Sequence, residues 1–255
     1  MRALLTISRF VALEARRTGM LWLFAGAAAA GLGLTSFLSQ LALTEGGALQ
    51  AGVLAALFRV CAVFLTATFV ITSMVRESND KGVELLLSMP ISRTAYYLGK
   101  LLGFAACGCA LAAAFSLLIL AWSPPLAVGA WFVSLALETA LMAAVSLFFV
   151  VTLAQVVPAL AASASLYLLS RVIGAIQAVS SGPLLDDRAY LQKAAAWSID
   201  AVALILPPLD RATQTVWLIY GAPAAMEFLS IAGALLTYGL LIAAAGLFDF
   251  HRRNL

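Results

Sequence analysis

Charged residues and histidine are scarce in this sequence. Only 11% of the 255 residues are Asp, Glu, Lys or Arg, and His251 is the single histidine. A soluble domain carries about 25% charged residues, so water is a poor solvent for this chain. Because the one histidine lies near the C-terminus, a serine–histidine catalytic pair within an apolar segment has no base, and a histidine-rich metal cluster is excluded.

Cysteines and paired carboxylates are also few. Cys61, Cys107 and Cys109 all fall in apolar segments, where a thiol behaves as a small hydrophobe. On a helix, Cys107 and Cys109 point about 200° apart and so do not chelate one metal from one face. Glu138 is the single acid deep within the apolar segments, away from their ends, so paired-carboxylate catalysis has no second partner there. We expect neither enzyme activity nor a metal or cofactor held by this chain itself.

Long apolar stretches are what the sequence has instead. Hydrophobic residues make up 64% of the chain, the mean hydropathy is +1.03, and six stretches are apolar for about 20 residues or more. A helix of that length crosses the roughly 30 Å hydrocarbon layer of a bilayer. The predicted spans are 20–43, 53–75, 97–122, 129–157, 159–180 and 226–248. We therefore predict an all-α membrane protein, with residues 1–255 forming one domain.

Two details of these spans lead to further expectations. Pro158 separates the fourth and fifth spans with almost no loop, which predicts a tight reversal, with a single kinked segment as the alternative. Gly99 and Gly103 open the third span at a spacing that permits close helix contact, which suggests a dimer interface.

The first 19 residues have an amphipathic pattern. Arg2, Arg9 and Arg16 recur at seven-residue intervals and so form one basic stripe on a helix. Apolar residues follow a spacing of three or four on the other side: Leu4, Ile7, Val11 and Ala15. We expect an interfacial helix on an anionic membrane face. The alternative, a signal peptide, fits less well because the apolar stretch runs on to residue 43.

Basic residues gather on one side of the predicted topology. With the N-terminus inside, that side holds Arg2, Arg9, Arg16, Arg17, Arg76, Lys81, Arg93, Lys100, Arg252 and Arg253, whereas the other side holds only Arg188, Lys193 and Arg211. The positive-inside rule therefore places both termini in the cytoplasm. The outer segment 181–225 contains apolar runs too short to span, so we expect it to lie in the interface or to re-enter the membrane.

Three ionisable residues fall deep inside the predicted spans, away from the span ends. Arg59 lies about 9 Å from the outer end of its span, and Glu138 and Arg171 lie about 14 Å deep. Opposite charges at one depth relieve the cost of burial in lipid, so we expect Glu138 to pair with Arg171, with Arg59 nearby. Such a group either lines a substrate path or locks the bundle, and the sequence leaves both roles open.

The inner loop 76–96 carries a recognisable pattern. Gly82, Glu84, Leu86, Pro90, Ser92, Arg93, Gly99 and Lys100 occur in the order and spacing found after the second span in permease subunits of type-2 ATP-binding cassette transporters. The chain resembles that family, although Val83 replaces the usual threonine. The run Pro207 to Arg211 and the ending 248–254, with Asn254 in place of the usual aspartate, support the resemblance.

The resemblance implies a membrane subunit of an ATP-driven exporter. In such a family the loop helix docks on a separate ATPase, for which Glu84 and Arg93 would make polar contacts while Gly82 and Pro90 fix the helix ends. No phosphate-binding Gly-x-x-x-x-Gly-Lys-Ser/Thr loop occurs here, so ATP and Mg would bind the partner. A second permease chain, membrane lipids and the bacterial cytoplasmic (inner) membrane are also implied, and nucleic acid is not. An ion-coupled secondary transporter or a channel is the alternative.

Overall fold

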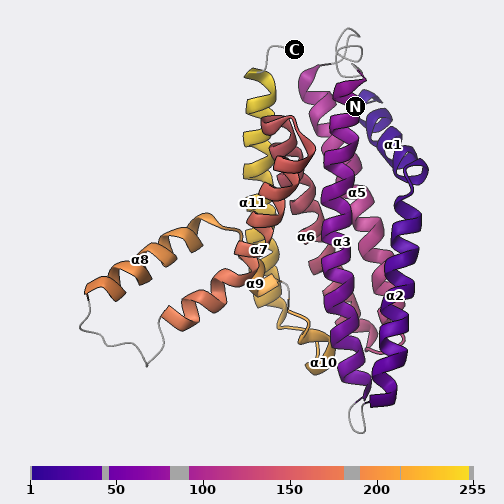
Figure 1. The fold of residues 1–255 in the computed structure, drawn as a ribbon, viewed down its shortest axis with the longest axis vertical. Coiled ribbons are helices and arrows are strands. Elements are labelled where there is room, and N and C mark those ends of the chain that lie inside the picture. Colours follow the sequence, from indigo (N-terminus) through magenta and orange to yellow (C-terminus); the bar gives the residue numbers. More distant parts are fainter. Residues whose placement is uncertain (1, 42–45, 81–91, 181–189, 213, 253–255) are drawn as a thin grey trace.

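Helices form all the regular structure in the described part of the chain. The computed structural model describes the protein except for residues 1, 42–45, 81–91, 181–189, 213 and 253–255 (Figure 1). Six helices are long and apolar enough to cross a membrane. They are α2 (Met20–Leu41), α3 (Gly46–Asn79), α5 (Arg93–Ile119), α6 (Pro125–Leu153), α7 (Val156–Ser180) and α11 (Ala225–Arg252). The prediction of an all-α fold with six candidate spans is confirmed for the described residues.

Helix α6 is the centre of the bundle. It packs against α3, α5, α7 and α11, and its side chains Trp131, Leu135 and Leu147 are fully buried. Helices α2 and α11 lie at the periphery and leave most of their side chains exposed. An apolar exposed surface on a peripheral helix is what a lipid solvent requires, because lipid tails do not penalise exposed leucine.

A tight reversal joins α6 to α7, as predicted from Pro158. Helix α6 ends at Leu153, Ala154 adopts a left-handed conformation with φ 56°, and α7 begins at Val156. The Ala154 N–H donates to the Val150 carbonyl at 3.0 Å, which closes the helix end. Pro158 lies in the first turn of α7, where a missing N–H costs no intrahelical hydrogen bond. The kinked single segment is excluded.

Helix α1 (Arg2–Arg17) is amphipathic in the way the sequence indicates. Ile7, Val11 and Ala15 are buried, whereas Arg9 and Arg16 are exposed. The buried side packs on α5. Figure 1 shows α1 inclined to α2, and Thr18 and Gly19 form the elbow between the two helices. Gly19 has φ +79°, a conformation that glycine adopts without strain. That α1 lies in a membrane interface stays a prediction.

Gly99 and Gly103 allow α1 to approach α5 closely. A Cβ atom added at Gly99 would lie 3.0 Å from the Ile7 Cβ, and one at Gly103 would lie 2.8 Å from the Val11 Cβ. The two glycines therefore make a contact within the chain. The expectation that they form a dimer interface is wrong for this face of α5, because α1 already covers it.

The described part of the segment 181–225 contains three helices. These are α8 (Tyr190–Ile205), α9 (Leu209–Ala212) and α10 (Trp217–Tyr220). Figure 1 shows α8 beside the end of α7, away from the bundle. By contrast, α9 and α10 pack on the bundle through the buried side chains Leu209, Ala212 and Leu218. All three are shorter than a membrane span. Their interfacial or re-entrant position stays a prediction.

Candidate functional site

A buried polar network links three of the long helices. Arg59 of α3 and Glu138 of α6 form an ion pair, and both side chains are fully buried. The Tyr167 hydroxyl of α7 donates to Glu138 Oε1 at 2.8 Å, and Arg171 Nη1 donates to the same hydroxyl at 2.9 Å. The structure thus brings the three predicted charges together, but the ion-pair partner of Glu138 is Arg59. Arg171 reaches the carboxylate through Tyr167.

The choice of Arg59 has a packing reason. Its guanidinium lies 5.3 Å from the centroid of the Trp131 ring, and its Nη1 donates to Ser134 Oγ at 3.3 Å. The Ser134 hydroxyl in turn donates to the Ala212 carbonyl at the end of α9. An aromatic face, a hydroxyl and a carboxylate together stabilise a buried arginine. The network therefore ties α9 as well as α3, α6 and α7.

Sequence reasoning missed Tyr167, although a signal was present. Tyr167 lies four residues before Arg171 and therefore on the same face of α7. A buried tyrosine hydroxyl needs a polar partner, so a tyrosine beside an intramembrane arginine was a candidate bridge. With Tyr167 on one oxygen and Arg59 on the other, both oxygens of Glu138 have partners.

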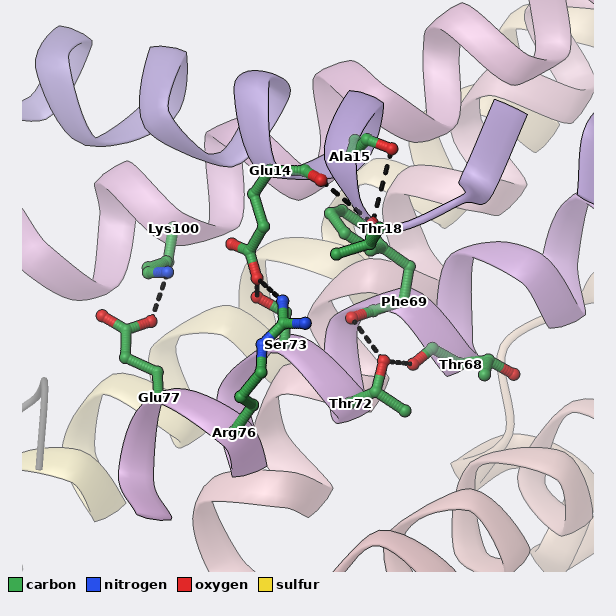
Figure 2. A network of polar contacts seen from close by, with 10 residues as sticks. All are labelled: Glu14, Ala15, Thr18, Thr68, Phe69, Thr72, Ser73, Arg76, Glu77 and Lys100. Atoms are coloured by element: carbon green, nitrogen blue, oxygen red, sulfur yellow. Dashed lines mark hydrogen bonds and ion pairs between the residues drawn. The ribbon is translucent and has the colours of Figure 1, made fainter. Parts of the chain in front are cut away.

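A second network holds α1, α3 and α5 together at the end of the bundle where α3 ends and α5 begins. Glu14 of α1 accepts hydrogen bonds from Arg76 and, at 2.8 Å, from Ser73 of α3, as Figure 2 shows. Glu77 of α3 forms an ion pair with Lys100 of α5 (Figure 2). The two acids thus connect the last turns of α3 to both neighbouring helices.

Lys100 is almost fully buried, with 1% of its side chain exposed. Its Nζ lies 5.7 Å from the centroid of the Phe10 ring and 5.8 Å from that of Phe104. Burying an ammonium group is costly unless it is paired, so the contact with Glu77 is what makes this position tolerable. The Gly99–Lys100 pair noted in the sequence pattern thus has two structural uses: close contact with α1 and an ion pair with α3.

Of the four residues that the resemblance assigns to coupling with an ATPase, Arg93 is the one that lies among the described residues. It occupies the first turn of α5 after Ser92, whose hydroxyl accepts from the Ala95 N–H at 3.2 Å. Arg93 Nη1 donates to the His251 carbonyl in the last turn of α11 at 3.3 Å. Gly82, Glu84 and Pro90 lie outside the described residues, so their predicted roles stay predictions.

The described residues contain no group of three or more His, Cys, Asp or Glu side chains that could hold a metal ion. Cys61, Cys107 and Cys109 are free thiols. The network around Glu138 and the network around Glu14 and Glu77 consist of ion pairs and hydrogen bonds. Such contacts hold helices in fixed positions relative to one another.

Comparison with known proteins agrees with the helical architecture. No curated protein matches the chain. A family model described as ABC-2 family transporter protein matches residues 10–255, which includes all six long apolar helices and the loop 76–96. The chain therefore belongs to the ABC-2 type transporter permease family.

Proposed function

We propose that this chain is the membrane-spanning subunit of an ATP-driven exporter and that a separately encoded ABC ATPase supplies the energy. The observation that carries the proposal is the family match over residues 10–255, in a chain that has no phosphate-binding loop of its own. ATP and Mg²⁺ bind the partner ATPase, and this chain converts the partner's movement into transport.

The segment 76–96, whose two ends belong to α3 and α5, is the proposed contact with the ATPase. Support comes from its two ends, which the described residues tie firmly to the bundle through Glu77–Lys100, Arg76–Glu14 and Arg93–His251. A force applied to a loop held in this way reaches α1, α3, α5 and α11 together. In this proposal Glu84 and Arg93 contact the ATPase, and Gly82 and Pro90 fix the ends of the loop helix.

The same proposal assigns an orientation and an assembly. Both termini and the loop 76–96 face the cytoplasm of a bacterial cell, and the chain spans the cytoplasmic (inner) membrane as one domain. Support comes from the gathering of basic residues on that side. A second permease chain, identical or different, completes the assembly, with lipid around it.

The buried network of Arg59, Glu138 and Arg171 is proposed to lock the bundle and not to bind cargo. Arg59 and Glu138 are 0% exposed, and both carboxylate oxygens are engaged. Arg171 is only partly buried, and it joins the network through the Tyr167 hydroxyl.

The test is to place a photo-crosslinking amino acid at position 84 and to identify the captured protein from native membranes by mass spectrometry. An ABC ATPase is expected at position 84 and not at exposed Ala222, the matched control, which follows α10 at the other end of the bundle (Figure 1). In the reconstituted complex, Glu84→Ala and Arg93→Ala should each leave ATP hydrolysis running while transport falls.

Two outcomes would contradict the proposal. One is capture of the same ATPase at position 222 but not at position 84. The other is a purified chain that moves protons or sodium across vesicles under an ion gradient with no ATPase present, which would favour the secondary transporter or channel.

A further inference from the structure

An apolar groove runs between α1, α2 and α5 beside the elbow at Thr18 and Gly19. Its volume is about 290 Å³, close to the lower limit of ligand-binding clefts. Arg16 is the one charged residue among those that line it. The lining includes Ala12, Ala15, Arg16, Leu21, Ala106 and Ala110.

The groove exists because alanines face each other where bulkier side chains would fill the space. Ala12 and Ala15 come from α1, and Ala106, Ala110 and Ala114 come from α5. At Gly103, nearer the start of α5, α1 touches α5 through Val11 and leaves no room. The two helices α1 and α5 are therefore in close contact at Gly103 and move apart toward the elbow, where the groove lies.

The surroundings of the groove indicate which kind of ligand it suits. Ala12, Leu21, Ala106 and Ala110 are exposed, so the groove opens on the outer flank of helices that are apolar enough to cross a membrane. Such a flank is covered by lipid. An apolar hollow on it takes an acyl chain at little cost, because both surfaces are hydrocarbon.

Arg16 adds a charge requirement to this apolar site. It is exposed, lies in the last turn of α1, and forms no ion pair with any residue in the described part of the chain. The nearby acid Glu14 is engaged by Arg76 and Ser73 and does not line the groove. An unneutralised arginine at the mouth of an apolar hollow favours an amphiphile with a negative headgroup.

We propose that this groove binds one acyl chain of an anionic phospholipid, whose headgroup phosphate pairs with Arg16. The lipid fixes the angle of the elbow and so holds α1, which carries Glu14 to the end of α3. The site requires no ATPase and holds in either orientation of the chain, so it stands independently of the proposed function.

The test is native mass spectrometry of the purified full chain, titrated in detergent with phosphatidylglycerol or with phosphatidylcholine of the same acyl chains. The wild-type chain should retain phosphatidylglycerol about fivefold more tightly, as expected for one arginine beside an anionic headgroup. Arg16→Gln should abolish this preference, and Arg9→Gln, which changes an exposed arginine outside the groove, should keep it.

A second pair of variants tests the hollow itself. Ala110→Phe fills the groove and should remove the retained lipid of both kinds, whereas Ala30→Phe adds the same ring to an exposed position on α2 outside the groove and should remove none. Equal retention of the two lipids by the wild-type chain, or an unchanged preference in Arg16→Gln, would overturn the proposal. Because Arg16 is exposed, that variant tests the idea even where Ala110→Phe fails to fold.

Discussion

Glu138 of α6 contacts side chains from two other long helices, α3 and α7. It is fully buried, paired with Arg59 and hydrogen-bonded by Tyr167. We predict that Glu138→Gln lowers the free energy of unfolding by about 3–5 kcal/mol, because it leaves the charge of Arg59 buried without a counter-charge. The measurement is denaturant unfolding in detergent. Glu227→Gln, at an exposed acid in the first turn of α11, is the control and should change little.

A double variant separates the charge from the packing. Replacing Arg59 and Glu138 together by methionine removes both buried charges and keeps apolar volume, so it should be less destabilising than Glu138→Gln alone. If the double variant unfolds more readily than the single one, an unpaired buried charge is not the reason that Glu138→Gln is destabilising. The loss of stability would then come from the hydrogen bonds to Ser134 and Tyr167.

The same network shows how far residue-level prediction goes. The depth of a residue along a span can be calculated from the sequence, since a helix rises about 1.5 Å per residue. This calculation predicted that Arg59, Glu138 and Arg171 lie in one region. The ion-pair partner was not readable, because it depends on how each helix is rotated and on Trp131, which offers its ring to Arg59. Side-chain rotation within a bundle is set by neighbours that lie far apart in sequence.

At the scale of elements, the contact between α1 and α5 depends on the absence of side chains. A methyl group at Gly103 would lie 2.8 Å from the Val11 Cβ, so one of the helices must move. We predict that Gly103→Ala costs about 1–3 kcal/mol of stability, in the range for overpacked contacts. Adding Val11→Ala should recover part of that loss. Gly26→Ala, where a methyl group meets nothing within 4 Å, is the matched control.

The ion pair between the last turns of α3 and the start of α5 gives a second prediction at this scale. Glu77→Gln leaves the Lys100 ammonium buried beside Phe10 and Phe104 without a counter-charge. We expect a lower unfolding midpoint, and a smaller loss when Lys100→Met is added, since no buried charge then remains. The check is a double-mutant cycle in detergent. A midpoint in Glu77→Gln equal to that of the wild-type chain would contradict the role given to this pair.

Element prediction succeeded where a local rule decides the outcome. Pro158 predicted the reversal between α6 and α7 because proline suits a first helical turn and disrupts a helix interior. The ends of α3 were less predictable: it runs from Gly46 to Asn79, beyond the expected 53–75 on both sides. Hydropathy marks the apolar part of a span, and the polar last turn of α3 continues as helix because Arg76 and Glu77 find partners on α1 and α5.

For the whole molecule, composition predicted the class and left the arrangement open. A mean hydropathy of +1.03 and six long apolar stretches are enough for an all-α membrane fold. That α6 is central and α2 peripheral does not follow from hydropathy, because both are strongly apolar. Leucine is as stable facing lipid as it is in a protein core, so the sequence of a membrane protein hardly distinguishes buried helices from lipid-facing ones.

The orientation of the whole chain can be tested directly. The distribution of basic residues predicts that Asp80 and the termini lie in the cytoplasm and that Ala222 lies outside. Asp80 and Ala222 are both exposed. In a background with Cys61, Cys107 and Cys109 replaced by alanine, a membrane-impermeant maleimide added to intact cells or spheroplasts should label Ala222→Cys and spare Asp80→Cys. Both should react once the membrane is opened. Labelling of Asp80→Cys in sealed cells would invert the topology and place the loop 76–96 where no ATPase could reach it.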